Sequence, residues 1–539
     1  MKKTLSIILV LLLCITVFSG CGSKKTVESG ASSAASEGED NDGFDLNLGS
    51  DEEGAGNSAS GGTGASGSNG TNTSGSGNAN TTGKITDLKG REIRVNVLAA
   101  LNPNDKGDKV RIDYAKTIEK KYNCKITFVP MMNESAGNHT IKNSVAGSSP
   151  IVDLWYQNDA SEIFLHYQAG YFINLSDLNV FDFDSPASPY KKGPQDIFRF
   201  GSAYYGVVSS QAATADPLGV NVMFFNKKLL NDYGISDDLY ALQDSNKWTW
   251  DKFKELADKF NINSSSNADV TACYDDGALL YNSLLHTRGT DWVKKENGIL
   301  KFNGNDKLAQ EALEVYKKYV SDGTVTLGSD PKKYGTDPRS DAAMAGTGMK
   351  YSFIKGQVAF TVYPLLGLEW SILKNPNTTP DIQKNYGVLM LPKVKSSDKY
   401  TFVSSISGQS GYAIPIGVKN PAEVATILNE LQTQPYDDTS MSKDLHDMRI
   451  KQNLPNNNST KDGISKTGKL IIDSILFDKV GTVSYIGLCA MAKPNLVTDD
   501  NGWHRHVYNI ATGKEAMGSV LTSVTDTYNT TLGSLFKQR

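Results

Sequence analysis

The most constraining feature of the sequence is an alternation of strand and helix patterns that begins at residue 93. Apolar residues first alternate with polar ones at Ile93, Val95 and Val97. They then recur at every fourth position at Val110, Tyr114, Ile118 and Tyr122, with Ile112 and Ala115 widening the stripe. Two further short apolar runs, 126–129 and 151–155, lie on either side of a short helical stretch near 141–145. Strands joined by crossover helices run parallel, so the pattern predicts an α/β fold.

Ligands of such sheets bind beyond the carboxyl ends of the strands. The third predicted strand ends at Trp155 and is followed by Gln157, Asn158 and Asp159. An indole offers a flat apolar surface, and amide and carboxylate groups bind hydroxyls, so these residues are candidates for a solute site. The alternative is that Trp155 is a core residue and that 157–159 cap the next helix.

Four later helices are well marked. Thr249 precedes an apolar stripe at 253, 256, 257 and 260, and Asn305 is a candidate cap for a helix that buries Leu308, Ala312, Val315 and Tyr319. Asn420, Pro421 and Glu423 form a capping pattern before the apolar face Val424, Ile427, Leu428 and Leu431. A last helix is predicted from about 514 to 536.

The N-terminus has the pattern of an export signal. Three residues, Met1-Lys2-Lys3, form a basic start, and 4–17 is an apolar run too short to cross a bilayer comfortably. The run closes on Phe18-Ser19-Gly20-Cys21, which resembles a lipoprotein signal sequence, so residues 1–20 are predicted to be removed and Cys21 to carry lipid. An ordinary secretory signal or an uncleaved membrane anchor is the alternative.

Residues 21–84 are rich in Gly, Ser, Asn and Thr, with an acidic stretch at 37–53 and almost no large apolar residues. Such a segment has no core to bury, so we expect a disordered, lipid-anchored linker. A flexible chain of this length has a mean reach on the order of 40 Å.

Charge and cysteine usage exclude several classes of protein. The formal net charge is −4, and no basic arm or stripe is present, which argues against nucleic-acid binding and against capture of a strongly anionic solute. Without Cys14 and Cys21, three cysteines remain (Cys124, Cys273 and Cys489), so at most one disulfide can form, and the sequence does not say whether it does. There is no CxxC pair, and we expect no metal and no cofactor.

Enzyme sites are weakly indicated. His504 and His506 would share one side of a strand and bind a metal, but no third ligand is evident and a surface loop is the alternative. Ser410 lacks the second glycine of a nucleophile turn. Asp275 and Asp276 would serve as glycosidase carboxylates, although adjacent aspartates are usually solvated. We therefore predict no catalytic residue.

Four stretches, in this order and spacing, resemble family 1 extracellular solute-binding proteins, the group similar to maltose-binding protein. They are 219–230, 247–253 with its Thr-Trp-Asp-Lys-Phe start, 353–364, and 386–392 together with 411–415 and the helix at Asn420. The resemblance implies a periplasmic-binding-protein-like fold of the class II type, with two α/β lobes, a hinge and a cleft between them. Lobe 1 would comprise 85–215 and 386–432, and lobe 2 would comprise 216–385 and 433–539.

In that arrangement the solute-binding residues come from both lobes. Lobe 1 would contribute Trp155, Gln157, Asn158 and Asp159. They would face Tyr363, Glu369 and Trp370, which follow the inward strand of lobe 2. Weaker candidates are Gln409 from the return segment and Trp503 from the tail. For the aromatic residues, burial in a core is the alternative.

The resemblance implies a monomeric, lipid-anchored protein on the outer face of the cell membrane that captures a mono- or oligosaccharide and delivers it to an ABC transporter permease. Two other functions stay open at this point: a secreted lipoprotein glycoside hydrolase, and a binding module that feeds a membrane sensor kinase. The sequence does not name the solute, because a handful of side chains decide specificity.

Overall fold

The structure is a computed structural model that describes residues 87–97, 100–130, 150–157, 166–185, 195–207, 221–264, 269–275, 278–328, 351–365, 375–400, 411–432 and 501–535, with short pieces and single positions between them. The chain divides into two units, 1–80 and 81–539. The predicted signal, Cys21 and the linker lie outside the described residues. No helix in the described part of the chain has both the length and the apolarity that a membrane crossing needs.

The elements are, in chain order, β1 (Arg91–Val97), α2 (Lys106–Tyr122), β2 (Cys124–Pro130), β3 (Trp155–Gln157), η2 (Leu175–Leu178), β4 (Arg199–Phe200), β5 (Ala203–Tyr204), β6 (Asn221–Asn226), α6 (Lys227–Asp232), α7 (Leu239–Asp244), α8 (Trp250–Ser264), β7 (Thr271–Asp275), α9 (Leu279–His286), β8 (Val293–Glu296), β9 (Ile299–Phe302), α10 (Lys307–Ser321), β10 (Thr326–Leu327), β11 (Val358–Pro364), α12 (Pro380–Asn385), β12 (Tyr386–Leu389), β13 (Ser404–Ser405), β14 (Gly411–Ala413), α13 (Pro421–Gln432), β15 (Val483–Ser484), α17 (Trp503–Ala511) and α18 (Met517–Leu535).

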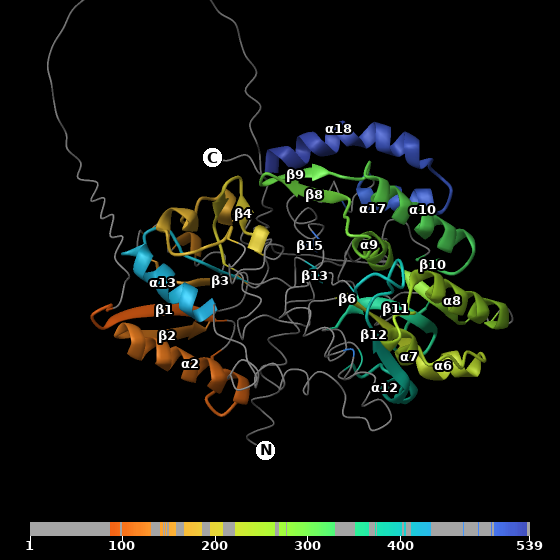
Figure 1. The fold of residues 1–539 in the computed structure, drawn as a ribbon, viewed down its shortest axis with the longest axis horizontal. Coiled ribbons are helices and arrows are strands. Elements are labelled where there is room, and N and C mark those ends of the chain that lie inside the picture. Colours follow the sequence, from red (N-terminus) through yellow and green to blue (C-terminus); the bar gives the residue numbers. More distant parts are fainter. Residues whose placement is uncertain are drawn as a thin grey trace, which may run out of the picture. The chain divides into compact units, whose positions relative to one another are not determined.

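One group of elements contains the first predicted strands and helix. β1 and β2 pair in parallel, β3 pairs antiparallel with β14, and a parallel bridge from Val95 to Leu154 joins the two pairs. Helices α2 and α13 pack on these strands, and the residues Ile93, Val95, Ala115, Ile118 and Ile427 belong to one buried cluster. The strand–helix–strand order of 91–130 is therefore confirmed, with the helix returning between parallel strands (Figure 1).

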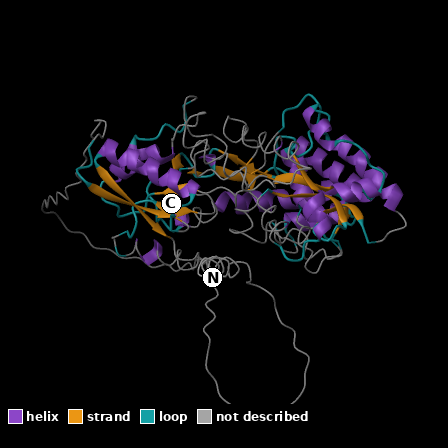
Figure 2. Cartoon of the chain, turned by 90° about the horizontal axis from the view of Figure 1, so that it is seen from below, coloured by secondary structure: helices purple, strands orange, loops and turns teal. Residues whose placement is uncertain are grey.

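The second group is built on a five-stranded sheet with the order β10-β7-β11-β6-β12. β7 is parallel to β10 and β11, whereas β6 is antiparallel to β11 and β12. Along β6, Met223 and Phe225 enter one core cluster and Val222 and Phe224 enter another. Alternate residues of a strand point to opposite faces, so this sheet is covered on both faces. Figure 2 shows helices around the strands of this sheet.

The C-terminal helices belong to the larger of these two cores. Trp503 and Val507 of α17, and Val520 and Tyr528 of α18, lie in the same buried cluster as α8, α9 and α10. The last helix was predicted from about 514 to 536 and is observed at Met517–Leu535. Cys124 and Cys273 are free thiols, and Cys489 lies outside the described residues.

Several local predictions were wrong. The predicted strand at 151–155 is shifted, because β3 begins only at Trp155. Asp306, not Asn305, caps α10, and its carboxylate accepts the N–H groups of Leu308 and Ala309. The buried face of this helix includes Ala309, Ala312, Leu313 and Tyr316, and Leu308 is 41% exposed. An apolar run does not reveal its own hydrogen-bond register, which is why both boundaries moved.

Two predictions about the return segment also need correction. β12 was assigned to the first lobe, but it pairs with β6 in the five-stranded sheet, and the chain rejoins β3 only at β14. At the start of α13, Asn420 has φ 46°, and its Nδ2 donates to Oε1 of Glu423 at 3.5 Å. The carboxylate of Glu423 thus contacts the side-chain amide of Asn420 and the guanidinium of Arg91, whereas a capping box would place it on the backbone N–H of Asn420.

Candidate functional site

The parallel strands define one carboxyl edge in each group. In the first group, β1, β2 and β3 run in the same direction, so Val97, Pro130 and Gln157 mark the edge. In the second group, β7, β10 and β11 run in the same direction, and Asp275, Leu327 and Pro364 mark the edge. Loops beyond such edges are where α/β proteins bind ligands, so each of these edges is a candidate binding edge.

At the first edge, Trp155 and Gln157 lie on β3. Trp155 is 3% exposed and packs in a small cluster with Ile141 and Phe172. Gln157 pairs through its backbone with Gly411 of β14. Asn158 and Asp159 lie outside the described residues. Trp155 therefore supports the sheet next to the edge, and its contact with solute stays a prediction.

At the second edge, Tyr363 is the penultimate residue of β11 and is 7% exposed. Glu369 and Trp370, which follow it, and Gln409 lie outside the described residues. Three predicted residues thus lie on strands that end at these edges: Trp155 and Gln157 on β3, and Tyr363 on β11.

Trp503 is the first residue of α17 and is 1% exposed. Its Nε1 donates to the hydroxyl of Tyr281 at 3.2 Å, and its ring is 6.0 Å from the ring of Trp292. These contacts favour a packing role inside the core, and a solute contact by Trp503 stays a prediction.

Asp275 is a buried carboxylate at the second edge, although we expected the Asp275 and Asp276 pair to be solvated. It ends β7, is 3% exposed, and accepts a hydrogen bond from the hydroxyl of Tyr316 at 2.7 Å. Burial raises its pKa to about 6, and hydrogen bonds from Tyr316 and from the backbone of residues 279–281 oppose that rise. Asp275 therefore holds the first turn of α9 against the end of β7. Asp276 lies outside the described residues.

The two candidate metal-binding histidines lie on helix α17 and not on a strand or a surface loop. His504 is fully buried, whereas Nδ1 of His506 is 2.8 Å from Oε2 of Glu515. Residues two apart on a helix do not face each other, so the shared face that a strand would provide is absent here. In the described ranges, no group of three or more His, Cys, Asp or Glu side chains is placed to hold a metal ion.

Arg111 is a polar residue near the first edge that the sequence reasoning missed. It lies on α2, four residues before Ala115, which is buried with Ile118 and Tyr122 on the same side of the helix. The Nε of Arg111 is buried without a hydrogen-bond partner. The signal was visible in the sequence, because an arginine continues the apolar stripe of this helix toward its N-terminus.

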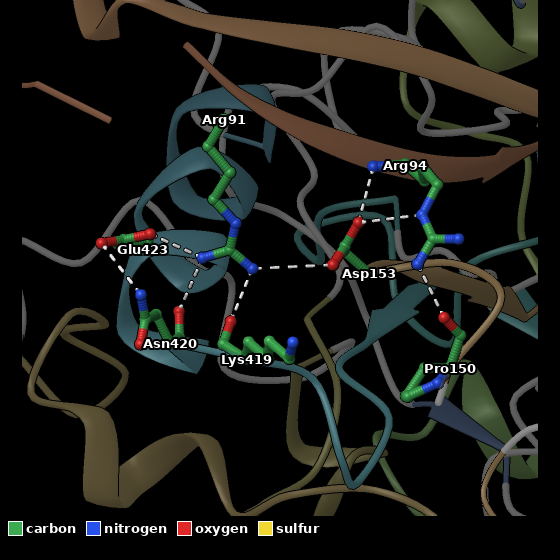
Figure 3. A network of polar contacts seen from close by, with 7 residues as sticks. All are labelled: Arg91, Arg94, Pro150, Asp153, Lys419, Asn420 and Glu423. Carbon is green, nitrogen blue, oxygen red and sulfur yellow. Dashed lines mark hydrogen bonds and ion pairs between the residues drawn. The ribbon is translucent and has the colours of Figure 1, made fainter. Parts of the chain in front are cut away.

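The amino end of the same sheet carries a network of paired charges (Figure 3). Arg91, the first residue of β1, donates to Oε2 of Glu423 at 2.6 Å and to the carbonyls of Lys419 and Asn420 at 2.5 and 3.2 Å. Asp153 accepts the backbone N–H of Arg94 at 2.8 Å and lies 3.6 Å from the guanidinium of Arg91. This network joins β1 to the start of α13 and to the segment before β3.

Comparison with known proteins identifies a family match. The model of the family described as bacterial extracellular solute-binding protein matches residues 113–437, which run from within α2 through the five-stranded sheet to α13. No curated protein matches the chain.

Solved structures match over most of the chain at low sequence identity. A family 1 extracellular solute-binding protein is 13% identical, with 82% of this chain and 100% of that chain covered and a TM-score of 0.52. A sugar transporter from Rhizobium etli in an open conformation is 12% identical, with 81% and 98% covered and a TM-score of 0.51. At these identities the likeness shows the fold, which is the two-lobed α/β architecture of solute-binding proteins.

Proposed function

Because this chain belongs to the family of bacterial extracellular solute-binding proteins, we propose that it captures a mono- or oligosaccharide outside the cell and delivers it to the permease of an ABC importer. The observation that carries the proposal is the family match over 113–437. A second support is that one structure with the same fold is described as a sugar transporter.

The candidate site agrees with capture of a small solute. Each group of elements presents the carboxyl ends of parallel strands, and planar polar side chains and aromatic rings lie at these edges or follow them in sequence. We propose that solute is held between the two edges by residues from both; the proposed contacts are Trp155, Gln157, Asn158, Asp159, Tyr363, Glu369, Trp370, Gln409 and Trp503.

Closure of the two lobes on the solute gives the importer its signal. A transporter must distinguish loaded from empty binding protein, and the solute supplies that signal when it binds the closed state more tightly than the open state. The protein itself does no chemistry on the solute in this proposal, and it acts as a monomer with no cofactor.

The test is a thermal-shift screen of the purified protein against mono- and oligosaccharides, followed by titration and small-angle scattering with the best hit. Binding to the folded state alone raises stability by about 2.7 kcal/mol at a hundredfold excess of ligand over Kd. We expect a higher melting temperature, a smaller radius of gyration on saturation, and intact sugar by chromatography. Weaker affinity is expected for Gln157→Ala and Trp370→Ala, with Lys307→Ala as the matched surface control, since that side chain is 89% exposed.

Three results would contradict the proposal: no sugar that raises the melting temperature, no change of radius on saturation, or a cleaved sugar product. The last would favour a glycoside hydrolase.

We propose further that Cys21 carries the lipid that keeps the protein at the outer face of the membrane. The proposal rests on the apolar run 4–17 and on the residues from Phe18 to Cys21. Detergent partitioning of Cys21→Ser should move the protein to the aqueous phase. Retention of this variant in the membrane fraction would mean that the apolar run itself is the anchor.

A further inference from the structure

Helix α2 begins at the carboxyl edge of the first sheet. β1 and β2 are parallel, so the helix that connects them returns along the sheet from the carboxyl end of β1 to the amino end of β2. Arg111 is the sixth residue of α2, about 8 Å from the helix start at 1.5 Å per residue. The Cα atom of Arg111 therefore lies near the carboxyl edge, where we place the solute.

The side of α2 that carries Arg111 faces the core. Ala115, Ile118 and Tyr122 recur at helical spacing after Arg111 and are 3%, 2% and 4% exposed. A buried stripe predicts an apolar residue at position 111, and leucine would satisfy it. The sequence has a permanent cation there instead.

Arg111 has no anion to pair with in the part of the chain that the structure describes. Its Nε is buried without a partner, and no ion pair or hydrogen bond of its guanidinium occurs among the described residues. Buried polar groups are normally hydrogen-bonded, because an unpaired one costs about 1 to 3 kcal/mol. The unpaired Arg111 therefore lowers the stability of the folded protein when no ligand is bound.

Tyr412 and the partly buried Tyr156 belong to the same apolar cluster as Ala115 and Ile118 of α2. The two tyrosines are partners across β3 and β14, with ring centroids 5.1 Å apart, and Tyr156 is one residue from the carboxyl end of β3. Burial raises the pKa of Tyr412, and the positive charge of Arg111 opposes that rise, so the guanidinium acts on this pair. Arg111 thus lies on the helix that packs against this aromatic pair.

A guanidinium with a buried, unpaired Nε is suited to a planar anion. Its N–H groups form a fork that matches a carboxylate in two parallel hydrogen bonds, and the low-dielectric surroundings strengthen such a pair. A phosphate would fit the same fork, but Arg111 is the only Lys or Arg among the described residues with a buried nitrogen that lacks a partner, and a dianion calls for more positive charge. A single negative charge is the simplest match.

We infer that Arg111 is a solute-binding residue that pairs with the carboxylate of an acidic sugar, so that the preferred ligand is a uronic acid or an oligosaccharide containing one. The inference rests on the proposed function and narrows its ligand class. It assigns a role to a residue outside the predicted set of contacts. It also agrees with the near-neutral net charge of −4, because one local cation recognises one carboxylate without a strong overall field.

The test compares acids with their methyl esters, which keep the size and shape of the sugar but lack the charge. Titration of the wild-type protein uses glucuronic and galacturonic acid, their di- and trisaccharides, and the corresponding esters. We expect at least one acid to bind about tenfold or more tightly than its ester, with the ratio falling as salt rises.

Variants at position 111 and at a matched site then locate the effect. Arg111→Met keeps the stem and should reduce the ratio of acid to ester affinity to about one, mainly by weakening the acid. Arg111→Lys keeps the charge without the fork and should give an intermediate ratio. Lys116→Met removes a positive charge from the exposed face of the same helix, where its side chain is 65% exposed, and should leave the ratio unchanged.

The outcomes separate the two proposals. Equal or tighter binding of the esters by the wild-type protein overturns the inference and leaves the proposed sugar binding standing. So does an Arg111→Met variant that weakens acid and ester equally. Absence of binding by any sugar, neutral or acidic, overturns both. If Arg111→Met does not fold, the ratio measured for Arg111→Lys against Lys116→Met decides the question.

Discussion

The arginines near the two ends of the first sheet differ in whether their charge is paired. At the amino end, Arg91 is bound by the carboxylates of Glu423 and Asp153 and by two carbonyls (Figure 3). Near the carboxyl end, Arg111 lies on a buried helix face with no partner among the described residues. The paired charges around Arg91 join elements of the fold, and the unpaired Arg111 is the charge that we infer to bind solute.

The largest effect is expected at the amino end. Arg91→Leu leaves Glu423 and Asp153 without their shared cation, and both carboxylates are largely covered, at 29% and 11% side-chain exposure. We expect the free energy of unfolding to fall by about 2 to 3 kcal/mol, measured by urea denaturation.

The matched control for this change is Lys125→Leu in the same sheet. Lys125 pairs with Glu92, and both side chains are exposed, at 68% and 46%. Its loss should lower stability by less than about 0.5 kcal/mol. Equal losses for the two variants would mean that the amino-end network is no more than a surface feature.

A smaller effect on stability is expected from the titration of Asp275, which lies at the carboxyl edge of the five-stranded sheet. Its folded pKa of about 6 lies above the ordinary value of 3.8, so the folded protein takes up a proton at higher pH than the unfolded chain does. Stability from this group therefore increases as the pH falls from 7 to 5, by on the order of 1 kcal/mol.

The measurement is the melting temperature of the wild-type protein and of Asp275→Asn at both pH values. Asparagine does not titrate, so the difference between the two pH dependences isolates this carboxyl group from all others. Identical pH dependences would show that the hydrogen bonds from Tyr316 and the start of α9 keep Asp275 ionised throughout this range.

The smallest effect is expected for the stability of Arg111→Leu. Leucine continues the apolar stripe of α2 and removes an unpaired buried donor, so we expect the free energy of unfolding to rise by about 0.5 to 1 kcal/mol while acid-sugar affinity falls. Urea denaturation checks this beside the Arg91 variant. A loss of stability as large as that of Arg91→Leu would remove the contrast between the two ends of the sheet.

Much of the fold follows from local patterns. The two-residue period at 93–97 and the four-residue recurrence at 110–122 predicted β1 and α2, and the stripe at 253–260 predicted the buried face of α8. Such patterns are readable because a strand and a helix each repeat their contacts over a few residues. Boundaries were less predictable, as at Asp306 and Trp155, because neighbouring polar residues compete for one cap or one register.

What the sequence by itself determined is the α/β class, the positions of most helices and the family, all of which depend on short-range order along the chain. Tertiary structure decided which polar residues are paired. Arg91 and Glu423 are 332 positions apart, and Asp275 accepts a hydrogen bond from Tyr316 of another element. β12 pairs with β6 and not with the first sheet. The physical reason is that the free energy of a charge depends on burial and on a partner brought close by folding, and neither is encoded in the residues beside it.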